Sequence, residues 1–305
     1  MSAYLEKEFE RMTKSKIEFF PSSGPVHEWT EHLHPAVEII FFVKGEHIVT
    51  MDEEMIFTAK PGDMVIFPSN TVHVLAKKKN EPVLHYALKL HPDLLFSAFI
   101  DVPTAYITQL FGKSIRENTY FPAERIPGCI LEQWNCMIGL LGGNIGYRAV
   151  EKQAKKDALL FVALRNEAIR LVLLIFRYLL PPVGDVAEPG INRQMVQRIL
   201  NGINYIEENY AEPITPEDCA AHLCMSYSHF AKQFRAVTGR TFKQYLTYIR
   251  ISHAESELLT SNDSVTEIAM RTGFNNVSHF IATYRALRGK TPLETRRARS
   301  EEISG

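Results

Sequence analysis

Ser228-His-Phe230, Arg235-Ala236 and Gly239-Arg-Thr241 decide the fold of the C-terminal third of the chain, because each of them returns 50 residues later. The second copy reads Ser278-His-Phe280, Arg285-Ala286 and Gly289-Lys-Thr291. Seven identities and one Arg/Lys exchange at a single spacing indicate the duplication of one supersecondary unit. The pattern predicts two helix-turn-helix units in tandem.

Residues that favour a helix start precede each copy. Thr215-Pro-Glu-Asp218 offers an N-cap hydroxyl, a proline for the first turn and acids for the positive end of a helix. Ser264-Val-Thr-Glu267 has the spacing of a capping box. We therefore expect the first helix of each unit to begin at these two positions.

The second helix of each unit is expected over residues 227–237 and 277–287. Ser226 and Asn276 can cap these helices, and Gly239 and Gly289 can end them. Apolar residues at helical steps predict one long helix over residues 242–259 that joins the two units. Four aromatic residues are expected to turn inward as core: Phe230, Phe234, Phe280 and Tyr284.

DNA contacts are expected on the exposed faces of the second helices, since the second helix of a helix-turn-helix lies in the major groove. Lys232 can donate to guanine, whereas the second unit exposes a mostly apolar surface that suits thymine methyl groups or shape and backbone contact. The expected base contacts are Ser228, Ala231, Lys232, Val277, Ser278, His279 and Ile281. The expected phosphate contacts are His229, Arg235, Lys243, Arg285 and Lys290. A solvated lysine is the alternative for Lys232, and helix-start packing is the alternative for the histidines.

The N-terminal part of the chain has a different pattern. Short segments rich in branched and aromatic residues, at 37–43, 47–51, 64–67 and 83–90, predict a small β-barrel or sandwich over about residues 15–90. Residues 92–180 are expected to be helical, and residues 181–190 form the expected linker. The predicted fold is α+β, with residues 1–180 as one region and residues 191–305 as an all-α domain.

Charge and hydropathy limit the classes of function that the chain can have. Ile191 to Arg299 carries 14 Lys and Arg against 10 Asp and Glu, whereas the whole chain has a net charge of −1. This asymmetry suits a DNA-binding domain on an acidic sensor, and it argues against a nonspecific architectural DNA protein. The first residues lack the layout of a secretory signal, and the longest apolar run, Leu171 to Phe176, is too short to cross a bilayer. A cytoplasmic protein without a membrane segment is expected.

Four stretches of the C-terminal region together resemble the AraC/XylS family of transcriptional regulators. They are Glu217-Asp-Cys-Ala-Ala-His-Leu-Cys-Met-Ser-Tyr-Ser-His-Phe230, Phe234-Arg-Ala-Val-Thr-Gly-Arg-Thr-Phe-Lys-Gln-Tyr245, Arg250-Ile-Ser-His-Ala-Glu-Ser-Glu-Leu-Leu259, and Ile268-Ala-Met-Arg-Thr-Gly-Phe274 with Gly289-Lys-Thr-Pro-Leu-Glu-Thr-Arg296. The resemblance implies binding of double-stranded promoter DNA by both units and activation through contact with RNA polymerase. Members usually have Arg or Lys at the position of Ala282, and this departure weakens guanine reading by the second unit.

Two further motifs resemble the cupin superfamily. They are His32-Leu-His34-Pro-Ala-Val-Glu38 followed by Gly45, and Gly62-Asp63 followed by Pro68-Ser-Asn70-Thr-Val-His73. Asn70 replaces the usual glycine, a change that a left-handed turn tolerates. The resemblance implies a barrel with a pocket in which His32, His34, Glu38 and His73 hold a divalent metal, or an effector without metal. Strand alternation would place His32 and His34 on one face.

These residues, with Trp29, suit a small polar effector such as a sugar. Buried barrel residues without any ligand are the plain alternative. The chain is therefore expected to be an effector-responsive regulator, most simply an activator, and not an enzyme. The competing hypothesis is a metal-dependent cupin enzyme with an accessory DNA-binding domain. Residues 151–180 offer more apolar surface than one packed face needs, which predicts a homodimer, with a buried helix within one chain as the alternative.

Overall fold

A computed structural model describes residues 17–22, 32–52, 55–77, 82–99, 101–111, 119–142, 157, 159–181 and 193–297. The chain divides into two compact units, one ending at Arg193 and one beginning at Gln194. The expected linker over 181–190 lies outside the described residues except for its first position. Each unit is described by itself.

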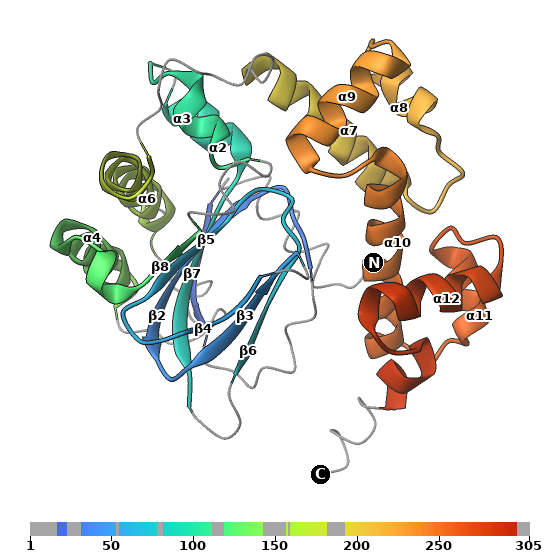
Figure 1. Ribbon diagram of the computed structural model, residues 1–305, viewed down its shortest axis with the longest axis horizontal. Coiled ribbons are helices and arrows are strands. Elements are labelled where there is room, and N and C mark those ends of the chain that lie inside the picture. The colour runs from blue at the N-terminus through green and yellow to red at the C-terminus, as the bar shows by residue number, and fades with distance from the viewer. Residues whose placement is uncertain are drawn as a thin grey trace. The chain divides into compact units, whose positions relative to one another are not determined.

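The N-terminal unit contains two antiparallel sheets (Figure 1). The five-stranded sheet has the order β1-β7-β2-β5-β8, with β1 (Ile17–Ser22), β7 (Leu84–Leu90), β2 (Val37–Lys44), β5 (Met64–Phe67) and β8 (Tyr120–Phe121). The three-stranded sheet has the order β4-β3-β6, with β4 (Met55–Ala59), β3 (His47–Met51) and β6 (His73–Lys77). The four segments predicted as strands are confirmed as β2, β3, β5 and β7.

Apolar side chains pack together between the strands of both sheets. This core contains Phe20, Ile40, Phe42, Val49, Met51, Ala59, Val65, Phe67, Leu75 and Ala87. They alternate along their strands with residues that face outward, as the period of a strand requires. The arrangement confirms the predicted cupin-like N-terminal fold.

Helices and the short strand β8 follow β7, so the region 92–180, predicted as helical, also contributes a strand to the five-stranded sheet. The helices are α2 (Pro92–Ala98), α3 (Thr104–Thr108), α4 (Gly128–Leu140) and α6 (Leu160–Tyr178). Trp134 of α4 stacks on Phe41 of β2 at a centroid distance of 5.4 Å and lies 6.0 Å from the ring of Phe19 in β1. The pair formed by α4 and α6 therefore covers the outer face of the five-stranded sheet (Figure 1).

The C-terminal unit is all helical in its described part (Figure 1). It contains α7 (Arg193–Asn209), α8 (Pro216–His222), α9 (Tyr227–Thr238), α10 (Phe242–Thr260), α11 (Val265–Arg271) and α12 (Val277–Arg288). Pairs α8–α9 and α11–α12 are the two helix-turn-helix units, and α10 is the predicted helix between them. The four aromatic residues Phe230, Phe234, Phe280 and Tyr284 are fully buried, as expected.

The helix ends follow the sequence signals with one exception. Thr215 and Ser264 both form reciprocal capping boxes, and the Asn276 side chain accepts from the amide of His279. Gly239 and Gly289 end α9 and α12 in the left-handed conformation, with φ of 72° and 67°. Ser226 is the N-cap residue of α9, as expected, but its side chain makes no capping hydrogen bond.

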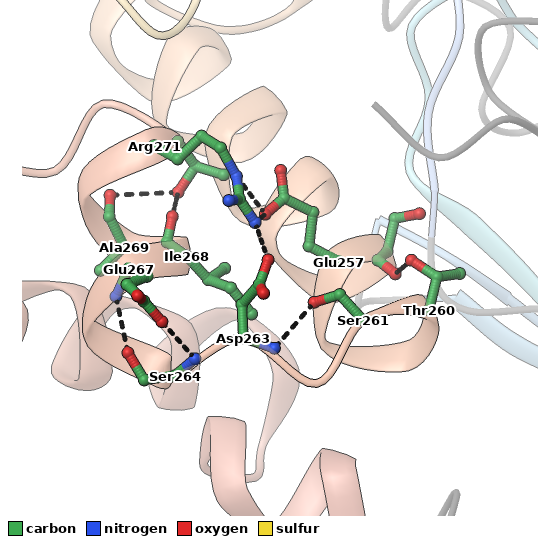
Figure 2. A network of polar contacts seen from close by, with 11 residues as sticks. Glu257, Thr260, Ser261, Asp263, Ser264, Glu267, Ile268, Ala269 and Arg271 are labelled. Atoms are coloured by element: carbon green, nitrogen blue, oxygen red, sulfur yellow. Dashed lines mark hydrogen bonds and ion pairs between the residues drawn. The ribbon is translucent and has the colours of Figure 1, made fainter.

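Ion pairs attach the second helix-turn-helix unit, α11 and α12, to α10. In Figure 2, Arg271 at the end of α11 reaches Glu257 of α10 and Asp263 of the loop between them. Its Nε donates to Glu257 Oε2 over 3.0 Å, and its Nη2 donates to Asp263 Oδ2 over 2.6 Å. Arg288 of α12 pairs with Glu255 of α10 at 2.6 Å, with both side chains buried. Because a buried charge is costly without its partner, the second pair fixes α12 on α10.

Candidate functional site

The face of α9 and α12 that DNA would meet is exposed. Ser228 and Lys232 of α9 are exposed and Ala231 is half-buried; on α12, Ser278, His279 and Ile281 are exposed and Val277 is half-buried. The residues expected at phosphates are all exposed as well: His229, Arg235, Lys243, Arg285 and Lys290. The aromatic residues of the same helices face the core, so each helix has one buried and one open side. Contact with DNA stays a prediction for every residue named here.

An open hollow lies on the exposed side of α12. Its lining residues are Ser278, Ile281, Ala282, Arg285, Ala286 and Thr291. Three of these residues are among the expected DNA contacts. Ala282 replaces the usual cation, and its small side chain leaves the hollow uncharged at that position.

The cupin-type residues meet at one place in the N-terminal unit. One ligand atom from each of His32, His34, Glu38 and His73 lies within 4.8 Å of all the others. Glu38 Oε2 is 2.9 Å from Nε2 of His34 and 2.9 Å from Nε2 of His73. Glu38 and His73 are buried, and the His34 side chain is 14% exposed. The predicted cluster is therefore present in the structure, while its ligand stays a prediction.

The backbone that positions His32 and His34 in this cluster differs from the one expected. His32 forms an isolated bridge with His73, and His34 lies in the bent segment before β2. The two residues therefore do not share a strand, and strand alternation was the wrong reason for their convergence. Asn70 has φ of 60°, the left-handed turn conformation that its place in the second motif requires. Trp29 lies outside the described residues.

Hydrogen bonds to the main chain fix two of the rings. Nδ1 of His34 lies 3.1 Å from the Ala36 carbonyl, and Nδ1 of His73 lies 2.8 Å from the Thr71 carbonyl. A carbonyl only accepts, so Nδ1 of each ring donates, and a neutral ring then turns the Nε2 lone pair toward Glu38. Burial lowers the pKa of His34 and favours the neutral ring. Two facing lone pairs repel unless a cation or a polar hydrogen from a ligand lies between them.

The donor set fits a divalent metal. Three imidazole nitrogens and one carboxylate oxygen are ligands of zinc, copper, iron and nickel ions, and main-chain carbonyls often hold the outer nitrogen of such histidines. A bound metal would act here as a Lewis acid or as an anchor for an oxygen-containing ligand. His32, His34, Glu38 and His73 are the residues that would hold it.

Two family models match the chain. One described as an AraC-like ligand binding domain covers residues 17–131, and one described as a helix-turn-helix domain covers residues 219–298. The chain belongs to the AraC family of transcriptional regulators. The ligand-binding match contains both sheets and the start of α4, and the helix-turn-helix match begins within α8 and contains α9 to α12.

Relatives of this AraC-family chain are themselves regulators. The chain is 24% identical over 264 residues to YbfI of Bacillus subtilis (strain 168), an HTH-type transcriptional regulator, and the match covers 86% of this chain and 85% of YbfI. It is 25% identical over 172 residues to the HTH-type transcriptional activator RhaS of Yersinia pestis, covering 56% of this chain and 57% of RhaS. Apo ToxT of Vibrio cholerae has the same fold, with a TM-score of 0.52, 13% identity and coverage of 91% and 95%. None of the described helices is long and apolar enough to span a membrane.

A buried charge that was not predicted from the sequence lies beside the histidine cluster of this AraC-family barrel. Lys89 of β7 is 1% exposed and lies in register with Glu38 of β2 on one side and Glu18 of β1 on the other. Burial alone would raise the pKa of Glu38, but the charge of Lys89 opposes this effect, and the pKa of Glu38 is held well below its usual value. The sequence contains a signal for this charge, because Lys89 lies within the otherwise uncharged strand segment Leu84-His-Tyr-Ala-Leu-Lys-Leu90.

A second histidine pair was missed as well. His85 Nδ1 lies 3.1 Å from His47 Nε2, and both side chains are buried in the barrel. Burial lowers the pKa of His47 to about 4, and burial together with the charge of His47 lowers the pKa of His85 to about 3. Both rings are therefore neutral at pH 7. The polar interior of the barrel is larger than the four cupin-type residues.

Proposed function

We propose that this AraC-family regulator is an activator that binds promoter DNA through both helix-turn-helix units and responds to a small polar effector in its barrel. The observation that supports this best is the repeated exposed face on α9 and α12, in a chain that also has a ligand-binding domain with a polar histidine cluster. The two second helices would enter successive major grooves, about 34 Å apart along B-DNA. The similarity to the transcriptional activator RhaS supports activation by this chain. Contact with RNA polymerase is the mode of activation that we propose for it.

The barrel cluster supports an effector with several hydroxyl groups. Neutral imidazole Nε2 atoms accept hydrogen bonds, as does the Glu38 carboxylate, and hydroxyl groups donate to both. A sugar carries many such hydroxyl groups at the spacing of neighbouring carbons. His32, His34, Glu38 and His73 would be its binding residues, with Trp29 as an apolar wall.

The exposed face of α6 supports a homodimer. Leu159 at its N-cap, Val162 and Leu173 are 71%, 42% and 46% exposed. With Asn166 and Ile169 they follow each other at steps of three and four residues, the spacing of a coiled-coil seam. A second copy of the chain would cover this stripe, and one polar residue within such a seam sets the register. The dimer would present two DNA-binding domains to repeated sites.

Selection of duplexes from a random pool by the full chain tests the DNA part of this proposal. Enrichment of one sequence with two contact regions about one helical turn apart is the expected result. The fragment upstream of the regulated gene should contain that sequence, and transcription from it should rise with the effector. A pool without any enriched sequence would contradict the proposed function.

The donor set of the barrel favours one second candidate, a metal-dependent cupin enzyme with an accessory DNA-binding domain. This candidate requires turnover of a small molecule by the metal-loaded chain. An effector that is recovered unchanged after incubation with the chain contradicts it.

A further inference from the structure

The two helix-turn-helix units provide an internal comparison at the surface that faces DNA. The hollow on α12 is lined by Ser278, Ile281, Ala282, Arg285, Ala286 and Thr291. Fifty residues earlier, the same positions of the first unit are Ser228, Ala231, Lys232, Arg235, Ala236 and Thr241. Four of the six are identical, so two positions carry the difference between the two surfaces.

Those two differences make the exposed surface of α12 less charged and more apolar than that of α9. Lys232 on α9 is an exposed cation, and its counterpart Ala282 has a small apolar side chain. Ala231 on α9 is half-buried, and its counterpart Ile281 is 37% exposed. The second unit has therefore lost a hydrogen-bond donor for guanine and has gained a branched apolar side chain at the neighbouring position.

Ser278 has an identical counterpart in Ser228 and so does not distinguish the two surfaces, and the other polar groups around the hollow do not replace Lys232 as a base reader. The Thr291 hydroxyl donates to Glu294 Oε2 over 2.9 Å and accepts from the Glu294 amide, so it is used to cap the following helix. Arg285 occupies the position of Arg235, and both are exposed at the rim, where a phosphate contact suits them. Ile281, Ala282 and Ala286 make up the remaining apolar surface.

We propose that α12 recognises thymine by its C5 methyl groups, which pack against Ile281 and Ala282, while α9 recognises guanine through Lys232. The thymine methyl is the one apolar feature of the major-groove edge of the bases, so the apolar surface of Ile281, Ala282 and Ala286 selects for it. This inference rests on the proposed binding of DNA by both units. It adds that the half-site under the second unit is rich in A·T pairs.

Uracil interference tests the inference, because deoxyuridine differs from thymidine only in the missing methyl. A duplex selected from a random pool by the full chain is made with sparse replacement of dT by dU, and bound and free fractions are separated and cleaved at uracil. We expect weaker binding where dU replaces dT in one half-site, by about fourfold for each methyl that packs on Ile281. In Ile281→Ala the same dU positions should no longer weaken binding.

Matched variants separate this effect from general damage. Met270 on α11 is 52% exposed and does not line the hollow, so Met270→Ala removes a similar apolar group and should keep the uracil pattern of the wild type. In Lys232→Ala the uracil pattern should also persist, whereas interference by guanine N7 methylation should disappear in the other half-site.

The outcomes also distinguish this inference from the proposed function on which it rests. An enriched sequence with no uracil effect in either half-site, or an effect that persists in Ile281→Ala, overturns the inference and leaves DNA binding by both units in place. A pool without an enriched sequence overturns both. Uracil interference that is lost only in Ile281→Ala supports the assignment of methyl reading to α12.

Discussion

Arg250 of α10 donates a 2.7 Å hydrogen bond from Nε to the main-chain carbonyl of Tyr210, in the loop that leads into the first helix-turn-helix unit. A second donor of the same guanidinium, Nη2, bonds the Glu212 carbonyl over 2.7 Å. Gly273, in the turn of the second unit, packs against the same side chain. One arginine therefore joins the helix between the units to a loop of the first unit and to the turn of the second.

Gly273→Ala should destabilise the DNA-binding domain by about 3 kcal/mol. Its φ is +86°, and a Cβ there would lie 2.8 Å from Arg250 Nε and 2.9 Å from the Ala211 carbonyl oxygen. Gly289→Ala is the matched control, since Gly289 also has positive φ, +67°, but has nothing within 4 Å of an added Cβ. Its expected cost is about 1 kcal/mol, the strain of the left-handed conformation. Urea unfolding of the full chain measures both, and equal losses would show that the contact with Arg250 is unimportant.

The His47 and His85 pair should make the barrel sensitive to acid. The pKa values in the folded chain, about 4 for His47 and about 3 for His85, lie below the ordinary value of 6.5. Between each folded-state pKa and pH 6.5, the unfolded chain therefore binds more protons than the folded chain. Stability is therefore complete above about pH 6.5 and falls as the pH drops toward 4, by about 1.4 kcal/mol per pH unit for each histidine. His32 and His34 act in the same direction because burial lowers their pKa values too.

The difference between wild type and His85→Leu isolates this pair. Urea midpoints at pH 7.5, 6, 5 and 4.5 should fall less steeply for His85→Leu than for the wild type, because one of the two buried histidines is absent. Parallel curves would mean that His85 is already protonated, or solvated, in the folded protein.

Local signals predicted the C-terminal domain well, and long-range pairing limited the prediction of the barrel. Thr215, Ser264 and Asn276 each accept from an amide three residues away, so their roles depend on the sequence next to them. Lys89 is different, because Glu18 and Glu38 become its neighbours only when three strands pair. His32 and His34 likewise meet His73 through a bridge between distant segments. The resemblance to cupins predicted this cluster correctly, whereas the strand assumed for His32 and His34 was wrong.

Lys232→Ala should weaken DNA binding at one base position by about 1–3 kcal/mol, because a lysine that donates to guanine O6 and N7 discriminates by that amount. Titration of the selected duplex, and of duplexes in which each guanine is replaced, measures the loss. Lys243→Ala is the control, since an exposed phosphate contact should weaken all sequences equally and lower the salt slope by about one unit. If Lys232→Ala weakened binding to all duplexes equally, Lys232 would be a phosphate contact as well.

Leu173→Glu should convert the dimer to a monomer, because it places a charge within the apolar stripe of α6. Sedimentation velocity of the full chain at micromolar concentration measures the change. Tyr178→Glu is the control, since Tyr178 is 51% exposed on the same helix but lies off the stripe, and it should leave the dimer intact. A wild type that sediments as a monomer, or a dimer that survives Leu173→Glu, contradicts the assignment of the interface to α6.

His34→Ala should abolish the response to the effector and leave DNA binding unchanged, because an effector alters DNA affinity only by binding two arrangements of the chain unequally. A panel of sugars is first screened by thermal shift on the full chain, where a ligand at 100 times its dissociation constant adds about 2.7 kcal/mol of stability. His91→Ala is the control, since His91 caps α2 and lies outside the cluster. Elemental analysis of the purified wild type and of His34→Ala accompanies the screen.

If the wild type contains metal and His34→Ala does not, the effector binds through that metal. If the wild type contains no metal and His34→Ala loses the response, the histidines and Glu38 recognise the effector directly. A normal response in His34→Ala would place the effector elsewhere in the barrel.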